Sequence, residues 1–300
     1  MKLLDAEPAM HLAIDALRAA LLGGLDPDAD PARSVVGVPA GQLLLMPASW
    51  AGFTGVKVAS VAPGNPARGL PRVQGHYLLL DGATLSPLAL LDGVAITSVR
   101  TAAVSAVAAG ALAEPDASRL VVFGTGPQAH SHVAALRAVR PVRELVVVGR
   151  DPVRTQDFAD KYGELSARAG TSADVAKADL VACCTTARTP LFDGALLPEH
   201  ATVVAVGSHE PDAREVDDTT ARRATVVVET TAAALREAGD VVQAVRSGAL
   251  AEPDLVPLAD LVRGRAHATG GPRLFKSVGM AWEDLVVAAA TYRAALGEGS

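Results

Sequence analysis

Apolar positions recur at helical spacing near the start of the chain and then give way to short extended runs. Over 7–22 alanines and leucines return every three or four residues, which predicts an amphipathic helix. Apolar runs separated by Gly and Pro clusters follow at 34–38, 42–46, 55–61 and 76–81. This pattern is typical of a mainly antiparallel sheet. A second helix is predicted over 98–112, and the sequence Glu-Pro-Asp at 114–116 ends it and marks a boundary.

After residue 119 the pattern changes to short apolar strands that alternate with helices. Strands are predicted at 119–124, 144–149, 165–168, 180–185, 202–206 and 225–229, with crossover helices at 127–139, 152–162 and 172–178 and a last helix at 281–296. Such alternation is typical of a doubly wound parallel α/β sheet. We therefore predict a Rossmann-type dinucleotide-binding domain over 115–274. A smaller α+β domain is expected over 1–114, completed by the C-terminal segment 275–300.

Composition narrows the class of protein. The 300 residues are 50% hydrophobic and 20% charged, which excludes a disordered chain. The formal net charge of −6 leaves no basic surplus for nucleic acid or an anionic membrane, so neither is expected as a partner. Asp5 and Glu7 stand where a secretion signal would need an apolar run, and we expect a cytoplasmic protein. No spacing of His, Cys or carboxylates predicts a metal site.

The strongest local motif is a strand that leads directly into a glycine-rich helix start of the form G-x-G-x-x-A. Gly124 permits the tight turn, Gly126 lets the backbone approach a pyrophosphate, and Ala129 keeps the helix close to the sheet. The helix N-terminus favours the anion. The motif therefore predicts a dinucleotide site that includes Gly124, Thr125, Gly126, Pro127 and Gln128.

The tip of the second parallel strand carries a clue to the cofactor. Arg150 stands near the position where an acidic residue would bind a ribose 2′-hydroxyl. An arginine there can pair with a 2′-phosphate, and a contact of about 1.5–3 kcal/mol favours NADP(H) by about ten- to hundredfold. Asp151, the next residue, supports NAD(H) instead, and a solvated Arg150 without a role is a third reading. We expect NADP(H) to be preferred, with NAD(H) possible.

Isolated charges in the apolar first region form a second candidate site. Arg33, Lys57 and Arg100 could converge on one carboxylate, and either arginine can bind it with two hydrogen bonds. Spacing alone favours the simpler reading that each ends in solvent or in a structural ion pair. His209 follows the strand at 202–206, where doubly wound sheets bind ligands, and it titrates near neutral pH. A loop histidine without a function is equally consistent with the sequence.

Several segments together resemble the ornithine cyclodeaminase and μ-crystallin family. They are GVKV around Lys57, the run 65–75, ITSVRTAAVSAVAA, GTGPQA, GSHEPDAREVD and FKSVG, in the family's order over nearly the whole chain. The resemblance implies that Arg33, Lys57 and Arg100 bind a substrate carboxylate and that Lys57 can donate a proton. It implies that the turn of Ser277, Val278 and Gly279 lies near the nicotinamide, and that Thr185, Val206 and Ser208 line the same crevice. It also implies a homodimer whose subunits meet through the first region and the terminal helix.

One position departs from the cyclodeaminases, in which the loop after the fifth strand resembles Gly-Gly-Asp-x-Pro-Gly and its aspartate handles the substrate amine. Here His209 stands in that place, and it is a candidate catalytic residue beside Lys57. Cyclodeamination depends on the amine-handling group, whereas a simple reduction does not. We therefore expect an NAD(P)H-dependent reductase of an α-imino acid such as Δ1-pyrroline-2-carboxylate, giving the L-amino acid. The alternatives are an ornithine cyclodeaminase, an alanine-type amino acid dehydrogenase and a non-catalytic NADP-binding protein.

Overall fold

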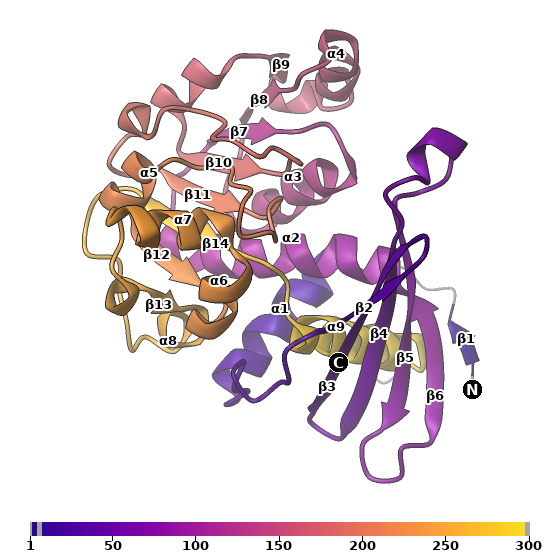
Figure 1. The fold of residues 1–300 in the computed structure, drawn as a ribbon. Helices are drawn as coiled ribbons and strands as arrows, with labels where there is room; N and C mark the ends of the chain where they lie inside the picture. Colours follow the sequence, from indigo (N-terminus) through magenta and orange to yellow (C-terminus); the bar gives the residue numbers. More distant parts are fainter. Residues whose placement is uncertain (1, 5–7, 298–300) are drawn as a thin grey trace. The chain divides into compact units, whose positions relative to one another are not determined.

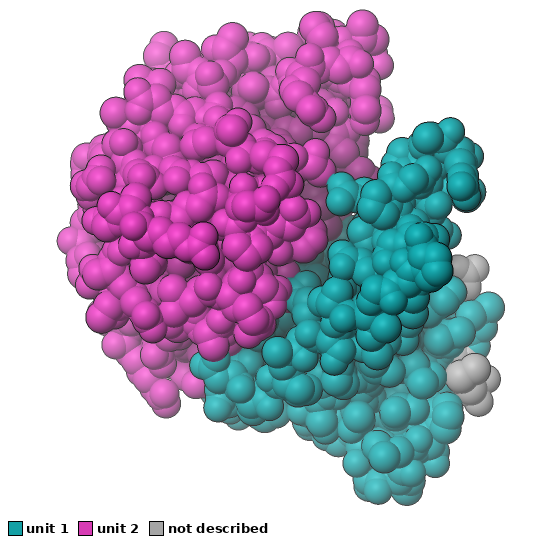
Figure 2. Space-filling view, viewed as in Figure 1, with its two compact units in different colours: residues 1–103, 280–300 teal, residues 104–279 magenta. Residues whose placement is uncertain are grey.

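A computed structural model describes residues 2–4 and 8–297, and the chain divides into two compact units. Unit 1 comprises 1–103 and 280–300, and unit 2 comprises 104–279 (Figure 2). The sequence placed these boundaries at 114/115 and 274/275. The first lies earlier because the apolar helix α2 (Gly93–Leu112) runs through it without a linker. The second lies later because β14 (Arg273–Lys276) is a strand of the unit 2 sheet.

Unit 1 contains a six-stranded sheet in the order β1-β6-β5-β4-β3-β2. Its strands are β1 (Lys2–Leu4), β2 (Ser34–Val38), β3 (Gly41–Trp50), β4 (Phe53–Val61), β5 (Val73–Asp81) and β6 (Pro87–Asp92). Strands β2 to β6 pair in antiparallel fashion, as the sequence predicted, and β1 pairs parallel to β6. The sequence missed β6 because its leucines form an apolar run that does not alternate with polar residues.

Two helices cover one face of this sheet (Figure 1). Helix α9 (Ala281–Ala295) packs on β3, β4 and β5, and α1 (Met10–Leu22) packs on α9. The predicted start of the first helix at residue 7 lies outside the described residues. Alternate residues of β4, including Gly55, Lys57 and Ala59, are buried, because successive side chains of a strand point to opposite faces. Lys57 therefore projects from the buried face of the sheet.

Unit 2 contains an eight-stranded, fully parallel sheet in the order β13-β12-β14-β11-β10-β7-β8-β9. The strands other than β14 are β7 (Arg119–Phe123), β8 (Glu144–Val148), β9 (Arg168–Ala169), β10 (Leu180–Cys183), β11 (Thr202–Ala205), β12 (Thr225–Val228) and β13 (Val256–Pro257). Its helices are α3 (Pro127–Val139), α4 (Pro152–Asp160), α5 (Asp218–Arg223), α6 (Thr231–Glu237), α7 (Gly239–Ser247) and α8 (Leu258–Val262). The doubly wound α/β fold is confirmed. The predicted crossover helix at 172–178 is a 3-10 segment, Ser172–Lys177.

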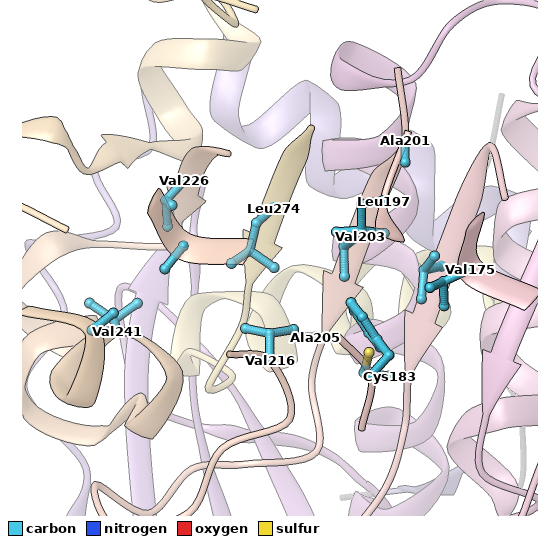
Figure 3. Packing of buried hydrophobic residues seen from close by; sticks show 14 of the residues in the cluster. Val175, Cys183, Leu197, Ala201, Val203, Ala205, Val216, Val226, Val241 and Leu274 are labelled. Carbon is cyan, nitrogen blue, oxygen red and sulfur yellow. The ribbon is translucent and has the colours of Figure 1, made fainter. Parts of the chain in front are cut away.

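Strand β14 lies in the middle of the sheet although it comes last in the chain. Leu274 is in register with Val203 of β11 on one side and Val226 of β12 on the other. All three residues belong to one buried apolar cluster, which also contains Cys183 of β10 (Figure 3). Phe275 and Lys276 of the FKSVG segment belong to this strand, and the predicted turn residues 277–279 follow directly after it.

Helix α2 is long and apolar enough to cross a membrane by length and composition alone. However, 61% of its most apolar window is buried inside the protein, as is usual for a core helix. Its Ser105 hydroxyl lies 3.0 Å from Nε2 of the fully buried His132 on α3. Burial lowers the pKa of His132 to about 4, so this pair is a neutral structural contact.

Candidate active site

Unit 2 has a cleft of about 820 Å³ at the carboxyl ends of β7, β8 and β10. Ligands of doubly wound sheets bind at this edge. The predicted residues that line the cleft are Gly124, Thr125, Gly126, Arg150 and Thr185. Pro127 and Gln128 follow as the first two residues of α3. The structure thus brings the glycines of the predicted dinucleotide motif, Arg150 and Thr185 to one cleft.

The two motif glycines are needed for different reasons. Gly124 has φ +110°, and a Cβ atom there would lie 2.5 Å from the Cys184 carbonyl oxygen, so the protein itself requires glycine. A Cβ at Gly126 would meet nothing within 4 Å. Gly126 caps α3, and Ala129 behind it is fully buried against the sheet. Gly126 therefore leaves room for a ligand beside the helix N-terminus, as a bound pyrophosphate requires.

The residues at the tip of β8 bear on whether the chain prefers NADP(H) or NAD(H). Asp151 caps α4, because its Oδ1 accepts hydrogen bonds from the backbone N–H groups of Val153 (3.0 Å) and Arg154 (3.2 Å). Arg150 and Arg154 both line the cleft, and within residues 2–4 and 8–297 neither guanidinium forms an ion pair. The sequence reasoning did not assign a role to Arg154. Its place in the first turn after the strand tip was the available signal.

The loops after β10 and β11 are held by a buried carboxylate. Glu215 accepts hydrogen bonds on Oε1 from the Thr185 N–H (2.8 Å) and hydroxyl (2.7 Å), and on Oε2 from the Gly207 N–H (2.7 Å). Burial raises the pKa of Glu215, although the charge of Lys276 opposes the shift. Glu215 therefore joins Thr185, after β10, to Gly207, which directly follows the predicted cofactor residue Val206 after β11.

The turn after β14 is held by a second buried carboxylate. Glu229, directly after β12, accepts from the Ser277 hydroxyl (2.7 Å) and from the N–H groups of Val278 (2.8 Å) and Gly279 (2.9 Å). The structure thus gives all three predicted turn residues one common acceptor. The sequence reasoning missed Glu229. An acidic residue at the end of a buried valine strand was its only signal.

A buried ion pair supports the loop that carries Ser208. Lys276 Nζ lies 2.8 Å from Asp240 Oδ2 and donates to the Ser208 carbonyl at 2.7 Å. Asp240 also accepts from the backbone N–H groups of Glu215 and Val216. Ser208, Asp240 and Lys276 are all buried, so the pair replaces the hydration that each charge loses. None of these contacts was visible as a spacing in the sequence.

His209 is exposed on the same loop. Its acidic neighbours Glu210 and Asp212 both pair with Arg188, which follows β10; the Arg188–Glu210 distance is 2.9 Å. The three side chains are about half exposed or more. The acidic residues next to His209 in the sequence are therefore already paired with an arginine.

In unit 1 the structure brings Lys57 and Arg100 together on two buried carboxylates of α9. Lys57 Nζ lies 2.9 Å from Asp284 Oδ1 and 2.7 Å from its Oδ2. Arg100 contacts Asp284 through Nε (3.0 Å) and Glu283 through Nη1 (2.6 Å). Arg33 is half-buried, and its charge acts on Lys57. The sequence left open whether these cations converge or form ion pairs, and Lys57 and Arg100 do both.

Burial changes the titration of the groups around this cluster. The pKa of Lys57 is lowered to about 8 by burial and by the charges of Arg100 and Arg33, and the charge of Asp284 opposes the shift. Burial raises the pKa of Asp30 to about 6, against a backbone hydrogen bond from Trp282. The buried Tyr77 hydroxyl, which has no hydrogen-bond partner among the described residues, also has a raised pKa. Lys57 is thus a cation that can exchange a proton near neutral pH.

The chain is similar in sequence and fold to several known proteins. A Δ1-pyrroline-2-carboxylate reductase of Paracoccus denitrificans is 35% identical over 284 residues, 91% of this chain and 90% of the relative. The solved structure of a Thermococcus litoralis Δ1-pyrroline-2-carboxylate reductase with NADH and L-proline has a TM-score of 0.88 at 31% identity, covering 96% of this chain and 94% of that one. An archaeal alanine dehydrogenase dimer with bound NAD has a TM-score of 0.89 at 27% identity, covering 97% and 94%.

The family resemblance noted in the sequence is confirmed as well. The model of the ornithine cyclodeaminase/mu-crystallin family matches residues 5–299, which is nearly the whole chain. The relatives named as imino-acid reductases agree with the expected activity class, an oxidoreductase acting on C=N bonds. This chain belongs to the ornithine cyclodeaminase/mu-crystallin family.

Proposed function

We propose that this protein is an NAD(P)H-dependent reductase that converts a cyclic α-imino acid, such as Δ1-pyrroline-2-carboxylate, into the L-amino acid. The observation that carries the proposal is the buried cluster of unit 1. There a lysine with a lowered pKa lies next to an arginine in one contact network. An α-imino acid presents a carboxylate and an adjacent C=N bond, and this pair of cations matches both groups.

The chemistry needs one hydride at the α-carbon and one proton at the imine nitrogen. Bound NAD(P)H supplies the hydride. Arg33 and Arg100 bind the substrate carboxylate, which orients the C=N bond. Lys57 is mostly protonated at pH 7 because its pKa is about 8, and it donates the proton to the nitrogen. We keep His209, which is exposed on its loop, as a second candidate catalytic residue beside Lys57.

We propose NADP(H) as the preferred cofactor, with NAD(H) as a weaker one. Arg150 and Arg154 both line the cleft, where a 2′-phosphate would meet two guanidinium groups. Asp151 uses its carboxylate to cap α4, which removes the acidic group that would favour a 2′-hydroxyl. The related structures hold NADH or NAD, so the arginines at the tip of β8 carry this part of the proposal.

Turnover of ornithine is expected to be negligible. His209 replaces the family's amine-handling aspartate, and an imidazole carries no negative charge in either protonation state, so it does not hold an ammonium group as a carboxylate does. Glu210 and Asp212 pair with Arg188 and do not offer a fixed negative charge in its place. We expect His209→Asp to leave reductase activity diminished but present and to improve ornithine binding at most slightly.

We propose a homodimer formed through unit 1. Edge strand β2 is exposed along its whole length and presents Val35, Val36 and Val38. Exposed apolar residues on an edge strand are typical of a covered interface. The related archaeal alanine dehydrogenase is a dimer.

One assay tests the proposed function. Purified protein is given NADPH or NADH with Δ1-pyrroline-2-carboxylate, its six-membered homologue and α-keto acids plus ammonia, and cofactor oxidation is followed. A parallel reaction with ornithine and NAD measures ammonia and proline. Fast oxidation with a cyclic imine and no ammonia from ornithine supports the proposal. Stoichiometric ammonia and proline at a comparable rate would establish a cyclodeaminase instead.

A further inference from the structure

The first turn of α9 carries two adjacent acidic residues that are fully buried. Glu283 and Asp284 have 0% exposure, and the buried residues around them on the helix are Ala, Leu, Val and Trp. An ionised carboxylate in such surroundings persists only when a cation or hydrogen bonds compensate it. The helix N-terminus favours both negative charges. Two cations on other elements, Lys57 of β4 and Arg100 of α2, form ion pairs with them.

The two carboxylates divide these cations unequally. Asp284 places both oxygens on Lys57 Nζ, at 2.9 and 2.7 Å, and also contacts Arg100 Nε at 3.0 Å. Glu283 contacts Arg100 at 2.6 Å and has no ion pair with Lys57 among the described residues. Asp284 is therefore the carboxylate that joins the lysine to the arginine, whereas Glu283 acts on the arginine.

The groups that face Lys57 from the other elements do not supply a negative charge of this kind. The uncharged hydroxyl of Thr97 on α2 accepts a hydrogen bond from Lys57 Nζ at 3.1 Å, and Arg100 and Arg33 are cations. Tyr77 is the neighbour of Lys57 on β5, and its phenol is neutral near pH 7 because its pKa is raised. Burial and both arginines disfavour the ammonium form of Lys57, and the charge of Asp284 favours it.

We propose that Asp284 is a positioning residue for the reduction: it fixes the Lys57 ammonium beside the Arg100 guanidinium and keeps that lysine able to donate a proton. The inference rests on the proposed function, because it assigns the proton to Lys57. Asp284 acts through Lys57 and Arg100 and does not itself touch the reacting atoms. Loss of its charge leaves a buried ammonium that feels the charges of Arg100 and Arg33, and the lysine then releases its proton at a lower pH.

The test compares two isosteric variants of neighbouring residues, Asp284→Asn and Glu283→Gln. Reduction of Δ1-pyrroline-2-carboxylate by NADPH is measured from pH 6 to pH 10. Asp284→Asn is expected to move the alkaline limb of the pH profile of kcat/KM to lower pH by at least about one unit. It is also expected to lower kcat at pH 8 by about fivefold or more, because less of the lysine is then protonated. Glu283→Gln is expected to raise KM through Arg100 and to leave the alkaline limb in place. NADPH affinity should stay the same in both variants.

A direct titration of Lys57 separates this inference from the proposed function. The chain has five lysines, so protein labelled with 13C-lysine gives a simple NMR spectrum, and Lys57→Met assigns the signal. A lower Lys57 pKa in Asp284→Asn supports the inference even if imine reduction is not the reaction. An unchanged Lys57 titration together with an unchanged alkaline limb overturns it.

A charge-conserving variant covers the case in which Asp284→Asn does not fold. Asp284→Glu keeps the negative charge but moves it by one methylene. It is expected to retain the wild-type alkaline limb and to lower kcat by about tenfold, because the lysine stays charged but is misplaced. Wild-type kcat in Asp284→Glu together with a wild-type limb would contradict the positioning role.

Discussion

In unit 1 the buried carboxylate of Asp284 pairs with the side chains of Lys57 and Arg100, whereas in unit 2 the buried carboxylate of Glu229 accepts mainly from backbone N–H groups of the turn at 277–279. A buried carboxylate therefore has a different role in each unit. In unit 1 it sets the placement and protonation of cations that we assign to the substrate. In unit 2 it sets the shape of loops at the edge of a sheet.

The buried lysine of unit 2, like the buried carboxylate Glu229, holds the backbone of a loop. Lys276 pairs with Asp240, but its remaining hydrogen bond goes to the carbonyl of Ser208. The lysine is fully buried and fixes a backbone position, whereas Lys57 pairs with a carboxylate that it shares with Arg100. Substitutions should therefore have different signatures: lost turnover in unit 1 and lost stability in unit 2.

The largest expected effect is on turnover in Lys57→Met. Loss of the proton donor should lower kcat about 10²- to 10⁴-fold, while NADPH affinity stays the same because the cofactor cleft lies in unit 2. Steady-state rates and fluorescence titration with NADPH measure both quantities. The exposed Lys161→Met is the matched control and should be fully active. A Lys57→Met protein with wild-type kcat would exclude the proton-donor role.

Lys276→Met should act on stability. It leaves the Asp240 carboxylate buried without a cation, which costs about 3–5 kcal/mol of unfolding free energy. Urea unfolding measures the loss. The double variant Lys276→Met with Asp240→Asn should recover part of it, because no unpaired charge is buried. If Lys276→Met loses under about 1 kcal/mol, the buried pair does not support this loop as described.

The smallest expected effect is on cofactor choice. Arg150→Ala should reduce the preference for NADPH over NADH by about ten- to hundredfold, and Arg154→Ala should act in the same direction. Both effects should shrink at high salt, since exposed charges are screened. Asp151→Asn is the control, because asparagine also caps a helix well. Equal affinity of the wild-type protein for both cofactors would contradict the assignment of Arg150.

The sequence predicted features whose residues stand close together in the chain, and it did not predict contacts between residues that are far apart in the chain. The strand at 119–124 and the helix at 127–139 were predictable because glycines, Pro127 and the apolar strand stand next to one another. Lys57 and Arg100 were visible because each is an isolated charge in apolar sequence. Their partner Asp284 was not predictable, since it is 184 residues from Arg100 and looks like an ordinary acidic residue at a helix start.

The strand order of the unit 2 sheet could not be predicted from the sequence either, because it depends on pairing between distant segments. The four residues of β14 are too short to show a period, and nothing local indicates that they enter between β11 and β12. The short helices α5 to α8 were missed because five to nine residues give few turns to recognise. The carboxylate ligands of the loops, Glu215 and Glu229, could be found only after the strand order was known.

Because β14 comes late in the chain, the sheet of unit 2 stays incomplete during most of synthesis. While the chain leaves the ribosome, β11 and β12 are complete long before residue 273, and each keeps an open edge where β14 will enter. Open edges of apolar strands are templates for pairing with other chains. Helix α9 emerges later still, so Lys57 and Arg100 have no buried counter-charge until the segment 281–295 has folded. A nascent chain that stops before β14 thus exposes an unfinished sheet and unpaired cations together, which makes it recognisable to chaperones and proteases as incomplete.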